Sequence, residues 1–193
     1  MKRSHALAAG VLLLISGSAA AAQAADSSDA PARTTGHTVS AARWCEHQGG
    51  HDVTRVPYYV TSGGKLSPLG GEREMCVFKD TTKKTEIMIS ADSLAAKKPT
   101  LAALAYVRKP AGPSSPGNPA VAYCQGINGT AMFGNRPTDA GGWGPKGATS
   151  TDQVRGACMF ADGSVIDAWG LKYHQGGVIR GADLTKKFRA DMP

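Results

Sequence analysis

The 193-residue sequence has only one long apolar run, no cysteine before Cys45 and no basic stripe, and each absence excludes a class of protein. The apolar run, residues 6–15, is shorter than the roughly 20 residues that cross about 30 Å of hydrocarbon. No later stretch approaches that length, so we expect a soluble mature chain without a transmembrane segment. A lipid anchor on an N-terminal cysteine is excluded. The lysine pairs 83–84, 97–98 and 186–187 do not alternate with aromatic residues as in nucleic-acid grooves, so no nucleic-acid partner is expected.

The N-terminal region has the pattern of a cleavable secretory signal peptide. Basic residues 2–3 precede the apolar run 6–15, and small residues fill positions 16–25. The triplet Ala-Gln-Ala that ends at Ala24 places cleavage directly after that residue. We therefore predict that residues 1–24 are removed and that the protein is periplasmic or secreted, in a compartment where disulfides persist.

Four cysteines form two pairs with matching neighbours. Cys45 precedes Cys76 by nearly the same separation as Cys124 precedes Cys158. In both pairs an aromatic residue stands before the first cysteine, Glu or Gln follows it, and a glycine stands five positions on. The second cysteine begins Cys-x-Phe-x-Asp in both. These landmarks predict an internal duplication, and among the three pairings that four cysteines allow they favour Cys45 with Cys76 and Cys124 with Cys158.

A proline-rich segment separates the two cysteine pairs. Residues 108–119 carry proline at every third position from Pro110, which is typical of a polyproline II rod and predicts a semi-rigid linker. Residues 25–38 are polar and aperiodic and are expected to be disordered. The predicted organisation is a signal peptide at 1–24, a lead-in at 25–38, one module at 39–107, the linker at 108–119 and a second module at 120–193.

Each module is predicted to be α+β, a short helix followed by an antiparallel β-meander, and small enough to need a disulfide staple. A helix at 40–48 ends at a glycine pair, and Asn118 with Pro119 begins its counterpart in the second module. Asp162-Gly163 is typical of a two-residue hairpin. The predicted strands are 51–59, 74–78, 85–89, 130–133, 154–160 and 164–171, with further short helices at 90–98 and 182–189.

The second module resembles a small bacterial family. It carries Asn118-Pro119-Ala120, Tyr123-Cys124, Gly129, the run 157–164 (ACMFADGS) and Trp169. This pattern is similar to that of DUF333, whose members are often labelled hemolysins. The resemblance implies an envelope location and a compact, cysteine-bridged α+β fold, and it implies no activity.

The resemblance is incomplete. The family commonly has cysteine at the position of Ile166 and again shortly after Trp169, and this chain has neither. Residues 40–80 form a diverged copy that lacks the Asn-Pro, the Asp-Gly-Ser and the tryptophan.

The histidines do not form a recognisable metal or catalytic site. His47 and His51 flank glycines 49–50, which break the helix that an i, i+4 ligand pair needs. Cys45 has a better partner in the other cysteine of its pair than in a histidine. His174 precedes a Gly-rich stretch and is read as a loop residue.

Other polar motifs are also weak. Residues 142–147 match G-x-G-x-x-G, but no hydrophobic strand precedes them and no helix follows, as a dinucleotide site requires. Asp162, Asp167 and Asp183 are not paired by spacing. We therefore predict no cofactor, no metal and no enzymatic activity.

Aromatic residues in Gly- and Pro-rich segments are the predicted binding residues. Tyr58, Tyr59 and Trp143 lie in such segments, and exposed aromatic side chains on rigid scaffolds are typical contact residues. The alternative is that they cover a small core. The connection 134–149 is long enough for a functional loop.

The sequence as a whole predicts an exported, non-enzymatic binding or envelope-accessory protein, whose partner is an unidentified protein or envelope component. One alternative is an inhibitor of an extracellular hydrolase that presents a disulfide-braced loop. Another is a hydrolase that uses His47, His51 or His174 with an aspartate. Membrane lysis is disfavoured because no insertion segment remains after signal cleavage.

Overall fold

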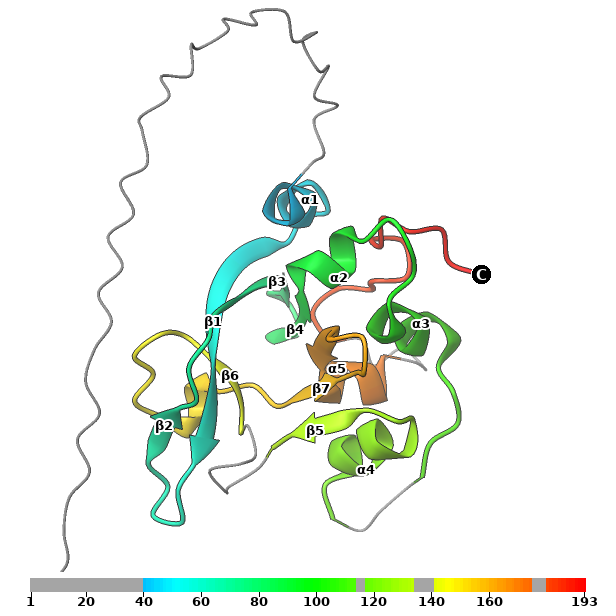
Figure 1. Cartoon of the computed structure of the whole chain (residues 1–193). Helices are drawn as coiled ribbons and strands as arrows, with labels where there is room; N and C mark the ends of the chain where they lie inside the picture. Colours follow the sequence, from blue (N-terminus) through cyan, green and yellow to red (C-terminus); the bar gives the residue numbers. More distant parts are fainter. Residues whose placement is uncertain (1–39, 114–116, 134–140, 175–179) are drawn as a thin grey trace, which may run out of the picture. The chain divides into compact units, whose positions relative to one another are not determined.

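The computed structural model describes residues 40–113, 117–133, 141–174 and 180–193, which form an α+β fold (Figure 1). Eight strands in this part of the chain make one antiparallel sheet in the order β2-β1-β3-β4-β8-β7-β5, with β6 paired to β1. The strands are β1 (His51–Val60), β2 (Leu66–Pro68), β3 (Arg73–Asp80), β4 (Thr85–Ser90), β5 (Thr130–Met132), β6 (Gly142–Gly144), β7 (Ala157–Met159) and β8 (Val165–Asp167). The helices are α1 (Ala41–His47), α2 (Ala91–Ala95), α3 (Leu101–Arg108), α4 (Pro119–Gly126) and α5 (Ala168–Tyr173), with a 3-10 turn, η1, at Thr151–Gln153.

Each cysteine-bridged half consists, as predicted, of a short helix followed by antiparallel strands. In the first half α1 precedes β1, β3 and β4, and in the second half α4 precedes β5, β7 and β8. Cys76 on β3 pairs with Ile89 on β4, and Cys158 on β7 pairs with Ile166 on β8. The same two isoleucines pair with each other and join β4 to β8. The residues beside the two cysteines therefore meet at the centre of the sheet.

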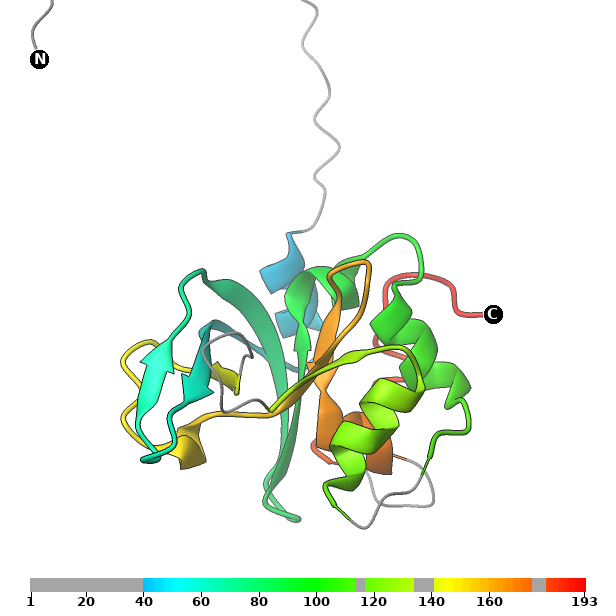
Figure 2. The same ribbon diagram turned by 60° about the horizontal axis from the view of Figure 1, so that its bottom comes forward.

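The two halves share one hydrophobic core, which the sequence did not predict. Helices from both halves contribute to it. In Figure 2, α3 and α4 lie on one side of the central strands, and β2 and β6 lie on the other. Fully burying one such aliphatic or aromatic side chain stabilises a fold by about 1.5–3 kcal/mol. Among its buried members are Cys45, Phe78, Ile89, Tyr106, Tyr123, Cys158, Ile166, Leu171 and Leu184.

The opposite face of the sheet curls around a second, smaller cluster. Alternate residues of a strand point to opposite faces, so Met75 and Val77 of β3 lie on this side with Met88 of β4 and Val165 of β8. Strand β6 pairs with β1, and Trp143 of β6 forms a single bridge to the residue two before β7. These pairings bring the β1 end of the sheet next to the β7 end and partly close the curl.

The described part of the proline-rich segment, residues 108–113, contacts helix α4. Helix α3 extends into it, and the Tyr123 hydroxyl of α4 donates a hydrogen bond to the Pro110 carbonyl at 2.9 Å. Gly112 lies so close to the Tyr123 ring that a Cβ would overlap it, and Pro113 lies equally close to Gly126. The described part of the segment thus packs on α4, because small and flat residues fit against its aromatic side chain.

The hairpin at Asp162-Gly163 exists, with three residues in its loop instead of two. Phe160 and Ser164 close it through a 2.9 Å backbone hydrogen bond, and Gly163 has a φ of 79°. The Asp162 carboxylate and the Ser164 hydroxyl of this hairpin also cap α3, a helix that the sequence did not predict. Asp162 accepts from the backbone N–H of Leu101 at 2.8 Å, and Ser164 accepts from the next one at 2.9 Å.

Two predicted elements are wrong because side chains compete for backbone groups. The predicted strand at 164–171 ends at Asp167, whose side chain accepts from the Gly170 backbone N–H and so begins α5. The predicted helix at 182–189 does not form. Asp183 accepts from the backbone N–H of Thr185 at 2.9 Å, a local turn that replaces helical bonding. The predicted helix at 90–98 is confirmed only as the shorter α2, and β2 and β6 were not predicted.

Candidate functional site

Both predicted disulfides are present. The sulfur atoms are 2.00 Å apart in Cys45–Cys76 and 2.08 Å apart in Cys124–Cys158, and all four residues are buried. The glycine five positions after each first cysteine lies over its bridge, where a Cβ would overlap both sulfur atoms. The recurring glycine therefore has a packing role. Disulfides fit an extracellular or periplasmic location.

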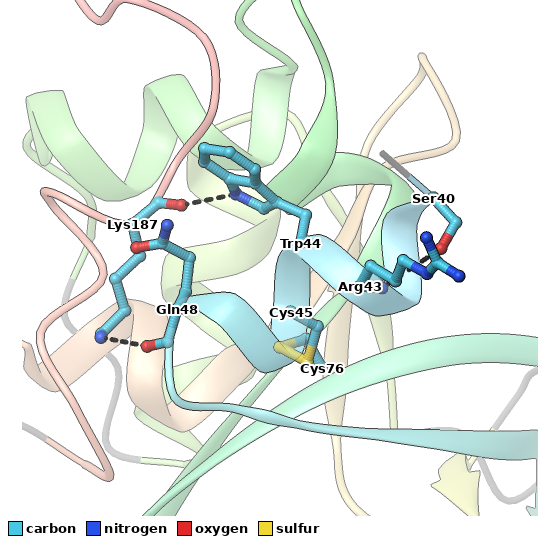
Figure 3. Close-up of a disulfide and its surroundings, with 7 residues drawn as sticks. All are labelled: Ser40, Arg43, Trp44, Cys45, Gln48, Cys76 and Lys187. Carbon is cyan, nitrogen blue, oxygen red and sulfur yellow. Dashed lines mark hydrogen bonds between the residues drawn. A yellow bond between two sulfur atoms is a disulfide. The ribbon is translucent and has the colours of Figure 1, made fainter. Parts of the chain in front are cut away.

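The C-terminal segment contacts α1, the helix that carries Cys45 of the first bridge (Figure 3). Trp44 donates its indole N–H to the Lys187 carbonyl at 2.9 Å. The Lys187 ammonium in turn donates to the Gln48 carbonyl at 2.6 Å, at the end of α1. These contacts hold α1 against the C-terminal segment, and the full burial of Cys45 and Cys76 indicates a structural staple, not an accessible redox pair.

Trp143 and Tyr58 are buried, which corrects the expectation of exposed loop aromatics. Trp143 is 7 % exposed and donates its indole N–H to the Met132 sulfur at 3.1 Å. Tyr58 is 3 % exposed, and its hydroxyl donates to the Pro145 carbonyl at 2.8 Å. The two rings are buried in different clusters, Trp143 in the one inside the curl and Tyr58 in a third with Val56 and Leu66. Tyr59 is half-buried. Their burial removes the reason to expect binding through these rings.

The three histidines have separate surroundings. His47 is exposed and stacks on Trp44 with ring centroids 5.9 Å apart, and His51 is exposed at the start of β1. His174 is half-buried and stacks on Tyr106 at 3.8 Å. Burial lowers the pKa of His174, and the nearby Lys109 adds to that shift. Among the described residues no group of three His, Cys, Asp or Glu side chains is arranged to hold a metal ion.

Several charged residues line a cavity at the end of β3 and the start of β4, which we call the arginine cavity. This cavity has a volume of about 490 Å³. Arg155, which leads into β7, and Arg180 of the C-terminal segment line it together with β3 and β4. The charged lining residues are Lys79, Lys84, Arg155 and Arg180, opposed by Asp80 and Glu86.

Backbone contacts fix both arginines. Arg155 and Trp143 exchange two backbone hydrogen bonds of 2.9 Å. Gly181, next to Arg180, donates its N–H to the Thr85 hydroxyl at 2.9 Å. With a φ of 67° and no room for a Cβ against the Phe78 carbonyl, position 181 requires glycine. Arg180 is therefore held beside β4.

The positive charge at this site exceeds what the nearby carboxylates neutralise. Arg155 forms an ion pair with Glu86 at 2.8 Å, and their side chains are 37 % and 20 % exposed. Burial lowers the pKa of Arg55, an effect that Glu86 counteracts and Arg155 reinforces. The Nε atoms of Arg55 and Arg180 are buried and have no hydrogen-bond partner within the described segments. Buried donors of this kind are normally satisfied.

A second cavity of about 390 Å³ shares the same two arginines, and polar groups make up much of its lining. We call it the apolar cavity after Val60, Phe133, Val154 and Trp169, which the arginine cavity lacks. Its lining also includes Phe133, Trp169 and Asp167. Asp167 is 2 % exposed. Burial raises the pKa of its carboxyl, while the charge of Arg180 acts in the opposite direction. Arg155 and Arg180 therefore lie at the boundary between two cavities, and only the second also has large apolar side chains in its lining.

These groups suit anion binding. Guanidinium groups donate paired hydrogen bonds to carboxylate, sulfate or phosphate oxygens. Neither cavity is lined by histidine or cysteine.

Comparison with known proteins gives no assignment, since no family model, curated protein or solved structure matches this chain. None of the helices in the described segments has the length and apolar character needed to cross a membrane.

Proposed function

We propose that the chain is an exported, non-enzymatic binding protein that holds an anionic ligand between Arg155 and Arg180. The signal-peptide pattern of residues 1–24 supports export, and the two disulfides fit the same compartment. This anionic ligand would be the partner that the sequence predicted only as an unidentified protein or envelope component.

One observation carries the proposal: guanidinium groups gather in a cavity without enough partners. Arg155 has Glu86, but Arg180 has a buried Nε without a hydrogen-bond partner in the part of the chain that is described. A buried unsatisfied donor costs about 1–3 kcal/mol. An anion between the two side chains would satisfy such donors with charge-assisted hydrogen bonds.

Binding is better supported than hydrolysis. A histidine–aspartate hydrolase needs a base within hydrogen-bond reach of the reacting group. His174 is engaged elsewhere, with its Nδ1 3.1 Å from the Leu171 carbonyl and its ring on Tyr106. His47 and His51 are surface residues of α1 and β1.

The matched architecture of the two halves supports descent from one duplicated, DUF333-like unit. Both halves place a glycine over the disulfide and pair the second cysteine with an isoleucine at the centre of the sheet. Arg155 and Arg180 belong to the second half, whereas Glu86 belongs to the first. The anion site thus combines residues of both copies.

Calorimetric titration with sulfate tests the proposed function. We expect saturable binding to the purified chain and an affinity loss of about 10-fold or more for Arg180→Gln, since a hydrogen bond to a charged group contributes about 1.5–3 kcal/mol. Arg108→Gln is the matched control, because Arg108 is exposed and lines neither cavity. A titration without a saturable binding signal, or an equal loss of sulfate affinity in Arg108→Gln, would contradict the proposal.

A further inference from the structure

We infer that the ligand is an amphiphilic anion, with its anionic group between Arg155 and Arg180 and an aromatic or branched apolar group in the cavity lined by Phe133 and Trp169. This inference rests on the proposed anion site and names the class of molecule that it takes.

The position of the two arginines leads to this class. Both side chains line the arginine cavity and the apolar cavity. An anion that contacts both arginines therefore lies at the boundary, and the remainder of the molecule has a cavity on either side. The volumes, about 490 and 390 Å³, fall within the roughly 300–1,000 Å³ of small-molecule sites.

The second cavity offers apolar surface that the fold leaves partly uncovered. Val60, Phe133, Val154 and Trp169 all line it, and each is only half-buried. Trp169 stacks on Tyr173 with centroids 5.8 Å apart and an angle of 13° between the rings, which restrains its orientation. Removing such surface from water favours binding of an apolar group at about 25 cal/mol per Å².

Charge sets the orientation of the bound molecule. Asp167 lines the apolar cavity, and its carboxylate repels an anion placed there. Lys79 and Lys84 line the other side, where Asp80 and Glu86 offset part of the positive charge. The anionic group is therefore favoured on the lysine side of the arginines, and the uncharged group on the side of Phe133 and Trp169.

Three sulfur oxyanions separate this inference from the proposed function: sulfate, methanesulfonate and benzenesulfonate. Both sulfonates stay ionised at all relevant pH values, so their comparison isolates the apolar group. We expect benzenesulfonate to bind the purified chain at least about 10-fold more tightly than methanesulfonate, the scale on which an apolar pocket discriminates. Benzenesulfonate should also change the tryptophan fluorescence, and the change should be much smaller in Trp169→Phe.

The apolar cavity is tested by Phe133→Ala, with the exposed Leu69→Ala as its control. We expect Phe133→Ala to lower the affinity for benzenesulfonate much more than the affinity for methanesulfonate, and Leu69→Ala to change neither. The comparison of ligands on the unmodified chain decides the question even if Phe133→Ala does not fold.

The outcomes are distinguishable. Equal affinity for the two sulfonates overturns the amphiphilic class and leaves the anion site standing. Binding of none of the three anions overturns both proposals. Tighter binding of benzenesulfonate that Leu69→Ala weakens as much as Phe133→Ala places the apolar group elsewhere and overturns the inference.

Discussion

Removing the second disulfide should destabilise the whole described fold, and the double variant Cys124→Ser/Cys158→Ser provides the test. The bridge joins residues 34 positions apart, and the Cys45–Cys76 bridge joins residues 31 apart. The chain-entropy model gives about 4 kcal/mol for a loop of either length, within an observed range of about 2–5 kcal/mol. Such a loss is a large fraction of the 5–15 kcal/mol typical of a folded domain.

The shared core determines how that loss is distributed. Both disulfides lie in one hydrophobic cluster, and β4 of the first half pairs with β8 of the second. Two independent modules would confine the loss to the second half. If the fold is one cooperative unit, the free energy of unfolding measured in either half should fall by the same amount.

Hydrogen exchange monitored by mass spectrometry in increasing urea distinguishes these cases. We expect peptides from β3 and peptides from β7 to lose protection in the same transition, shifted equally in the variant. The variant Cys45→Ser/Cys76→Ser should lose a similar amount, since its loop length is nearly the same. Unchanged protection in β3 after removal of the second bridge would refute the single unit.

Four further changes have defined outcomes. Trp143→Ala should lower the free energy of unfolding by about 3–5 kcal/mol, measured by urea denaturation, because it empties a buried site; a loss under about 1 kcal/mol would mean that the ring is not core. Gly129→Ala should also destabilise the fold, by roughly 1–3 kcal/mol in the same assay, because its Cβ overlaps both sulfur atoms; wild-type stability would contradict that packing. Asp167→Asn keeps an oxygen that can accept from the Gly170 N–H, and burial raises the pKa of the native carboxyl above its ordinary 3.8. The native chain therefore loses stability as pH rises from 3.8 to the raised pKa of Asp167, and the variant should not show that loss. The variant should also bind sulfate more tightly, because it lacks the negative charge. An equal pH profile of stability in both chains would argue against a raised pKa. Burial, helped by Lys172, lowers the pKa of Lys109 to about 8 from 10.5, so its contribution to stability should grow as pH rises from about 8 to 10.5; NMR titration of the lysine side chains should show one signal near 8, and its absence would refute the shift.

Local patterns carried the correct sequence predictions. The spacing of cysteines and glycines fixed both bridges, because a short helix, a glycine over the disulfide and a pairing strand recur within about 35 residues. The hairpin at Asp162-Gly163 is also local. The predicted strand at 164–171 and the predicted helix at 182–189 were wrong for a similar reason. In each, an aspartate side chain accepts a hydrogen bond from a nearby backbone N–H: Asp167 from Gly170, and Asp183 from Thr185.

Non-local pairing explains what could not be predicted. Nothing near Ile89 or Ile166 shows that their strands meet, so two halves of one sheet looked like separate modules. Trp143 looked exposed because the strands that bury it come from distant parts of the chain: it pairs with β1 and packs in a cluster with Met75 and Met132. Arg155 and Arg180 come from segments that only the fold brings to one cavity, and neither stands out in the sequence.

The claim that an anion binds between Arg155 and Arg180 is tested most directly by NMR of the arginine side chains. Titration of ¹⁵N-labelled protein with benzenesulfonate should shift the Nε–Hε signals of these two arginines, and the shifts should saturate together. The signals of the exposed Arg43 and Arg108 should stay in place. Equal small shifts in all four arginines, or none in Arg155 and Arg180, would contradict the anion site.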